Sequence, residues 1–116
     1  MAMGQSDPVD VPGPYPFRGE LLWLTPEQGG RRTGVPPGEL PAYAQVAHVP
    51  PQTVDSGTAS FVVRGFDPSS WRSSAEGRWL VVNNDGPHRV QEGSVVVITE
   101  GRTTVAYFTV KTIDRD

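Results

Sequence analysis

Glycine and proline recur along this chain and divide it into short segments rich in valine, threonine and aromatic residues. There are 13 glycines and 12 prolines among 116 residues. No long segment repeats its apolar residues at the 3.6-residue period of a helix. Short alternating segments separated by turn residues are typical of β-strands. The sequence therefore predicts an all-β fold, a small antiparallel β-barrel of about six strands that is closed or nearly closed.

The chain divides into a short tail and one domain. Residues 1–15 are rich in proline and contain no apolar segment, so we expect a disordered tail there. Residues 16–116 are expected to form the barrel, because about one hundred residues can bury one core without disulfides or metals.

The expected strands follow from alternation of apolar and polar residues. We predict strands at residues 17–24, 43–48, 58–66, 78–83, 94–99 and 103–114, with a loop at 67–76. Trp23 and Trp79 lie in strand patterns and are expected in the core. Trp71 lies in the loop, where it either covers one end of the barrel or is an exposed contact residue.

Composition limits the chemistry that this chain can perform. There is no cysteine, and His48 and His88 do not have the spacing of metal ligands. Neither a phosphate-binding GxxxxGK[ST] loop nor a GxSxG nucleophile motif is present. We therefore predict no metal, nucleotide or other cofactor and no enzymatic activity. Paired carboxylates remain an open alternative, although every acidic residue lies near a turn, where solvation explains it.

Charge and hydropathy bear on location and partners. No signal-peptide pattern is visible and the apolar runs are too short to span a bilayer, so we expect a cytoplasmic protein without membrane contact. The net charge is −3, from 13 acidic and 10 basic residues. Dedicated nucleic-acid binders usually carry a basic patch, so the composition favours a protein partner.

Two segments combine glycine with arginine. In Gln28–Thr33 two glycines precede Arg31 and Arg32, whose forked guanidinium groups suit phosphate or carboxylate. The second segment is Glu100–Thr104. Taken alone, both segments are well explained as turns whose arginines lie in solvent.

The order of these segments resembles the third, C-terminal β-barrel domain of elongation factor Tu. That domain has an opening strand, a loop of the form GGRxTP, a GYRP-like segment and a closing hairpin of the form REGGRTVGAG. Phe17–Leu24 resembles the opening strand and Glu27–Thr33 the glycine-arginine loop. Gly38–Pro41 stands where the GYRP-like segment would be. Residues 92–105 resemble the closing hairpin.

The resemblance implies a barrel without a nucleotide site. In the family this domain contacts the T-stem of aminoacyl-tRNA and packs against partner proteins. By position, those T-stem contacts correspond to Arg31, Arg32, Thr33, Glu100 and Gly101. Arginine can bind phosphate in a bidentate manner, and a glutamate can accept from a 2′-hydroxyl.

The chain also departs from the family pattern. Glu39 and Leu40 replace the tyrosine and arginine of the GYRP-like segment, so an acidic residue stands near a cationic contact. Ala106 and Phe108 replace late glycines of the closing hairpin. The GTPase domain and the middle barrel have no counterpart. We therefore expect a stand-alone binding module without GTPase activity.

Two binding functions follow. The first is binding of a protein partner, associated with translation, with Trp71 and Arg72 as contact residues. The second is weak tRNA or RNA binding through Arg31, Arg32 and the closing hairpin. An enzyme is the third alternative, and it would require a deep pocket with converging polar groups.

Overall fold

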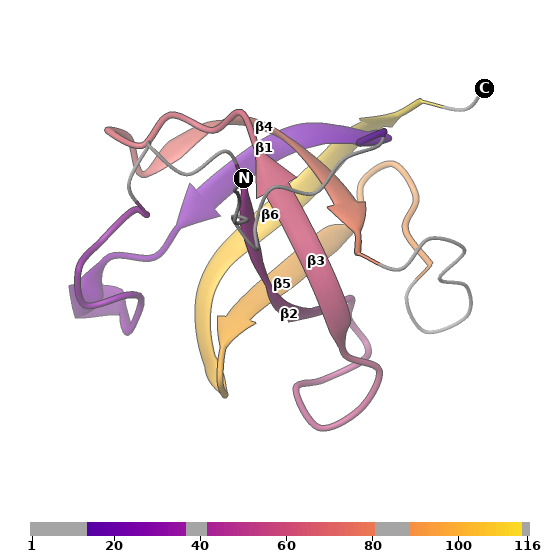
Figure 1. The fold of residues 1–116 in the computed structure, drawn as a ribbon. Helices are drawn as coiled ribbons and strands as arrows, with labels where there is room; N and C mark the ends of the chain where they lie inside the picture. The colour runs from indigo at the N-terminus through magenta and orange to yellow at the C-terminus, as the bar shows by residue number, and fades with distance from the viewer. Residues whose placement is uncertain (1–13, 37–41, 81–88, 115–116) are drawn as a thin grey trace, which may run out of the picture.

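The computed structural model describes residues 14–36, 42–80 and 89–114, which form six antiparallel strands closed into a barrel (Figure 1). The strands are β1 (Phe17–Trp23), β2 (Tyr43–His48), β3 (Ala59–Arg64), β4 (Arg72–Trp79), β5 (Val95–Glu100) and β6 (Thr103–Ile113). Their order around the barrel is β1-β4-β3-β2-β5-β6, and β6 pairs with β1. The predicted antiparallel barrel is confirmed.

Side chains fill the interior of the barrel. Trp23, Phe61 and Phe108 are fully buried. Phe61 meets Trp79 edge-on, with ring centroids 4.9 Å apart. Such edge-to-face pairs contribute about 0.5–1.5 kcal/mol beyond the burial of their area. The prediction that Trp23 and Trp79 belong to the core is confirmed.

Strand β4 corrects two predictions. It begins at Arg72, inside the predicted loop at 67–76, and it ends at Trp79, two residues into the strand predicted at 78–83. Residues 81–83 lie outside the described residues. The inward positions Ala75 and Gly77 are small, and a Cβ at Gly77 would lie only 2.7 Å from Cζ of Phe61. Because the phenylalanine fills this space, β4 lacks the large alternating apolar residues that mark a strand.

Tyr15 corrects the predicted end of the tail. Its side chain is only 4 % exposed and packs with Ala42 and Val62 in a second, smaller cluster beside the main core. The guanidinium carbon of Arg64 lies 3.8 Å from the centroid of its ring. Residues 1–13 of the predicted tail lie outside the described residues.

The seam between β2 and β5 is the shortest in the barrel. These strands pair only at Ala47–Ile98 and His48–Val97. The register of β5 shifts after Ile98, and there the Thr99 hydroxyl donates to the carbonyl oxygen of Val46 at 2.9 Å. Side chains, rather than backbone pairing, therefore join the two strands at this end.

Among the described residues, no helix is long and apolar enough to cross a membrane. The helical element found there is the short 3-10 turn η1 (Pro26–Gln28), between β1 and the glycine-arginine loop.

Candidate binding surface

The loop after β1 is held in one shape by its own hydrogen bonds. The Thr25 hydroxyl accepts from the backbone N–H of Gln28, and the Gln28 side chain accepts from the backbone N–H of Thr25, which forms a capping box. Gly29 has φ +89°, a conformation that favours glycine. Gly30 lies so close to Leu24 that a Cβ would come within 2.2 Å of the carbonyl oxygen. The glycines thus allow the tight turn that positions the two arginines.

Arg31 folds back onto the barrel and uses its donors internally. Its Nε donates to the carbonyl oxygen of Gly34 at 2.7 Å, and its Nη1 donates to Oε2 of Glu100 at 2.5 Å. Its Nη2 donates to the Thr33 hydroxyl at 3.3 Å. The Tyr43 hydroxyl donates to the same oxygen of Glu100. Tyr43 belongs to β2 and Glu100 to β5, so the Arg31–Tyr43–Glu100 cluster joins the open end of their seam.

The cluster changes the proton affinity of its members. Burial raises the pKa of Tyr43 above its ordinary value of 10.0, and the hydrogen bond to Glu100 raises it further. Burial lowers the pKa of Arg31, but the hydrogen bonds to Glu100 and Tyr43 outweigh burial and the pKa is raised overall. Tyr43 therefore stays a neutral donor, and Arg31 stays a cation that is already paired.

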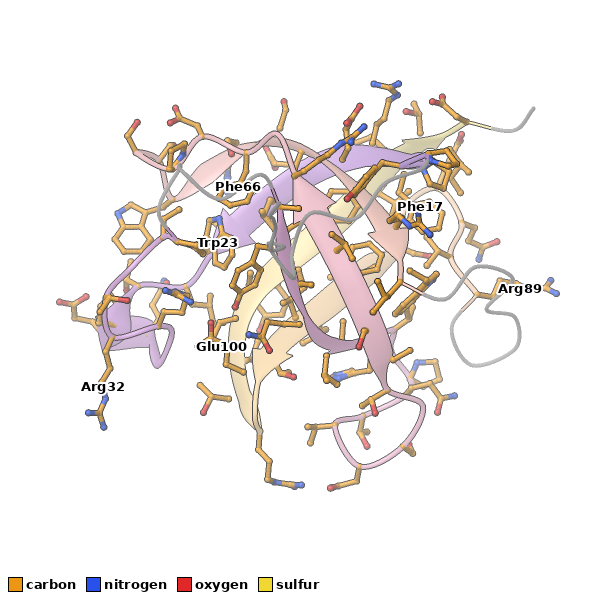
Figure 2. The ribbon with its side chains drawn as sticks, in the orientation of Figure 1. Phe17, Trp23, Arg32, Phe66, Arg89 and Glu100 are labelled. Atoms are coloured by element: carbon orange, nitrogen blue, oxygen red, sulfur yellow. The ribbon has the colours of Figure 1, made fainter. Side chains whose placement is uncertain are left out.

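Arg32 has the opposite orientation. Figure 2 shows its side chain extending away from the barrel. It is exposed, and the structure gives it no hydrogen bond or ion pair with any described residue. The donors of Arg31 are thus used in hydrogen bonds within the barrel, while the guanidinium of Arg32 is available to a ligand.

Arg32 stands between two hollows in the surface. The first hollow, of about 580 Å³, is lined by Pro26, Gly29, Gly30, Arg31, Arg32, Thr33, Glu100, Thr103 and Val105. The second hollow, of about 550 Å³, is lined by Pro26, Glu27, Arg32, Thr33, Gly34, Val35, Pro68, Ser69, Ser70 and Trp71. Arg32 and Thr33 belong to both hollows, so the two form one continuous surface.

Trp71 supplies the aromatic wall of the second hollow. Its side chain is 42 % exposed, so it is neither core nor a buried lid. Its carbonyl oxygen accepts from the backbone N–H of Trp23 at 2.7 Å. A Cβ on Gly34 would lie 3.4 Å from Cη2 of the indole, so the ring lies beside the loop backbone at Gly34. An exposed indole offers a large, rigid contact area with few rotatable bonds to immobilise on binding.

The structure brings four of the five residues implied by the resemblance to one place. Arg31, Arg32, Thr33 and Glu100 all line the first hollow. Gly101 occupies the exposed turn between β5 and β6, with φ +63°, and is not among the lining residues.

Arg72, the second predicted protein contact, does not line either hollow. It begins β4, and its Nε lies 3.9 Å from Oε1 of Glu20. Trp71 and Arg72 are neighbours in sequence, but Trp71 lines the second hollow together with Arg32 and not with Arg72.

Sequence reasoning missed Tyr43, whose hydroxyl completes the cluster on Glu100. It lies 57 residues from Glu100 in the chain, so no local pattern indicates the pairing. It also missed Glu27 and Pro68, which line the second hollow.

No protein-family model, no curated protein and no solved structure matches this chain. Within the described ranges, no group of three or more histidine, aspartate or glutamate residues is placed to bind a metal ion. The geometry of the surface is therefore the ground for a functional assignment.

Proposed function

We propose that this barrel is a protein-binding module, related to the third domain of elongation factor Tu and associated with translation, without GTPase activity. Its contact surface consists of Arg32, Thr33 and Trp71 with the second hollow between them, here called the Arg32–Trp71 surface. The observation that carries the proposal is the 42 % exposed indole of Trp71 beside the exposed guanidinium of Arg32, which pairs with none of the described residues.

Tryptophan and arginine suit such a surface for physical reasons. Both are enriched among the few interface residues whose truncation costs about 2 kcal/mol or more. The capping box at Thr25 and the hydrogen bonds of Arg31 hold the loop that carries Arg32. A surface that is ordered before binding loses less conformational entropy on association.

The relationship to elongation factor Tu is supported by the contact between the two segments that carry the resemblance. Arg31 in the glycine-arginine loop and Glu100 in the closing hairpin are 69 residues apart in sequence and hydrogen-bonded in space. The association with translation and the cytoplasmic location rest on the sequence resemblance and composition.

A photo-crosslinking experiment tests the protein-binding function. The full chain, with p-benzoylphenylalanine in place of Ser69 in the second hollow, is irradiated in an extract of the source cell. We expect a protein adduct, and we expect it to disappear when the same chain also carries the substitution Trp71→Ser. Leu80→Ser is the matched control, because Leu80 is also 42 % exposed but does not line the hollow. An adduct that persists with Trp71→Ser, or no protein adduct at all, contradicts the proposal.

RNA binding is a second candidate, favoured by one observation. Arg31, Arg32, Thr33 and Glu100 line the same hollow, as the resemblance to a tRNA-binding domain requires. However, Arg31 is already paired with Glu100, and the chain carries a net charge of −3. Affinity for a phosphate backbone grows with the number of phosphates neutralised, so this surface, where Arg32 alone of its described arginines is not paired, predicts weak, salt-sensitive binding.

A fluorescence titration with aminoacylated and uncharged tRNA, at low and physiological salt, decides between the two. Arg32→Ala is compared with Arg89→Ala, which removes the same charge from an exposed arginine on the other side of the molecule (Figure 2). Binding at physiological salt that Arg32→Ala abolishes, and Arg89→Ala does not, would replace the protein partner with RNA. If the wild type does not bind tRNA at physiological salt, the result supports the protein partner.

A further inference from the structure

The charges around the Arg32–Trp71 surface indicate the chemistry of its partner. At this end of the barrel, Arg31 is paired with Glu100, and Arg102 in the β5–β6 turn is paired in a bidentate manner with Asp55. Arg32 is exposed and has no such pair among the described residues. A single unsatisfied guanidinium is complementary to a single carboxylate, which it can bind with two parallel hydrogen bonds.

The acidic residues nearby disfavour a polyanion. Glu27 lines the second hollow together with Trp71, and Glu100 lines the first. A single-stranded nucleic acid that stacked a base on Trp71 would need a basic groove to follow its backbone. The surface combines the exposed guanidinium of Arg32, the paired Arg31 and Glu100, and the carboxylate of Glu27, which fits one acidic side chain better than a run of phosphates.

The second hollow indicates what lies beside that carboxylate. Its walls combine apolar groups of Pro26, Val35, Pro68 and Trp71 with hydroxyl groups of Thr33, Ser69 and Ser70. Such a surface suits a flat or rigid apolar side chain, because proline and aromatic rings pack on an indole with little loss of side-chain entropy. In an extended peptide, alternate side chains lie on one face about 6.6 Å apart.

We propose that the Arg32–Trp71 surface binds an extended acidic peptide segment of a partner protein. An aspartate or glutamate of the segment pairs with Arg32. A proline or aromatic residue two positions away packs on Trp71 in the second hollow. This inference rests on the proposed protein-binding function and specifies the partner's chemistry.

Selection from a random peptide library displayed on phage, against the immobilised full chain, provides the first test. We expect the selected peptides to share an acidic residue spaced two positions from proline or an aromatic residue. A selected peptide is then fluorescently labelled and measured by polarisation. Replacing its acidic residue by the matching amide, or Arg32 by alanine, is expected to weaken binding about tenfold or more. Combining both changes adds little further loss, since both remove the same contact.

Charge reversal sharpens the test. With Arg32→Glu, the preference is expected to invert, so that a peptide carrying lysine in place of its acidic residue binds better than the original. Arg89→Glu makes the same change of charge elsewhere on the surface and is expected to leave the preference unchanged. Thermal unfolding of each variant verifies that it is folded.

Specific outcomes overturn the inference. Two concern the selection: no peptide is selected, or the selected peptides lack an acidic residue. Two concern the labelled peptide: it binds Arg32→Ala as tightly as the wild type, or oligouridylate displaces it at a lower concentration than the unlabelled peptide does. A partner crosslinked at position 69 that binds Arg32→Ala as well as the wild type removes this inference but keeps the protein-binding function. Crosslinking that is insensitive to Trp71→Ser removes both.

Discussion

At the scale of single residues, Gly19 is the position among the described glycines where a side chain would come closest to its surroundings. It lies at the register shift between β1 and β6. A Cβ there would lie 1.9 Å from the carbonyl oxygen of Thr109, a backbone atom that cannot move aside. Glycine at this point is therefore a requirement of the close approach of two strands, not of a turn.

Gly19→Ala is expected to destabilise the barrel by roughly 3 kcal/mol or more, because β1 and β6 must separate to admit the methyl group. Gly65→Ala is the matched control: Gly65 has φ +77° and open space around it. Its cost is expected to be roughly 1–2 kcal/mol, from the left-handed backbone alone. Urea unfolding measures both. Equal losses would show that the approach of the two strands is not the constraint.

His48 is expected to make stability depend on pH. The residue is buried at the end of β2 and its Nδ1 has no hydrogen-bond partner among the described residues. Burial lowers its pKa below the ordinary value of 6.5. The unfolded chain therefore binds this proton more readily, and stability is lost as pH falls below about 6.5.

The free energy of unfolding of the wild type and of His48→Gln, followed by urea titration from pH 7.5 to 5.5, tests this dependence. The wild type should lose stability across this window and His48→Gln should lose less. The lowered pKa values of Asp55 and Asp67 act in a separate window, since their ordinary value is 3.8. An identical slope in both proteins would rule out His48 as the source.

At the scale of elements, the Arg31–Tyr43–Glu100 cluster substitutes for the backbone pairing that β2 and β5 lack. Glu100→Gln is expected to destabilise the barrel by about 1–3 kcal/mol, because it leaves the half-buried Arg31 without its charged partner. Tyr43→Phe should show coupling with Glu100→Gln in a double-mutant cycle followed by urea unfolding. The exposed pair Arg102–Asp55 is the control, where the coupling should be near the experimental error.

Strand prediction succeeded where apolar and β-branched residues form a segment bounded by turn residues. Strands β1, β2, β3, β5 and β6 lie at their predicted positions within a few residues. It failed at β4, where Ala75 and Gly77 are small and where Phe61 and Phe108 occupy the space that a side chain at Gly77 would need. The pattern of a strand therefore depends on what lies across the barrel, which local alternation does not contain.

The candidate site was likewise predicted only in part from the sequence. The resemblance named Arg31 and Glu100 as candidate contact residues, and in the structure their side chains are hydrogen-bonded to each other. It did not predict different roles for Arg31 and Arg32, which are two arginines adjacent in sequence. Their roles differ because Tyr43 and Glu100, distant in the chain, complete a binding site for one guanidinium and leave the other in solvent.

At the scale of the whole molecule, the barrel is completed by a segment outside its strands. Tyr15 covers the outward face of β3, where it packs on Val62 beneath the guanidinium of Arg64. Val62 is fully buried although it points away from the main core. The residues just before β1 therefore belong to the folded domain, although proline flanks Tyr15 on both sides.

Tyr15→Ala is expected to destabilise the protein by about 3 kcal/mol, because it uncovers Val62 and removes the aromatic partner of Arg64. Tyr15→Phe keeps the ring and should retain most of that stability. Deletion of residues 1–13, which the sequence predicts to contribute nothing to a core, should leave the free energy of unfolding unchanged. Urea unfolding of the three variants beside the wild type measures this. A loss on deletion that equals the loss from Tyr15→Ala would place the boundary of the domain before residue 14, whereas a loss from Tyr15→Ala alone places it between residues 13 and 15.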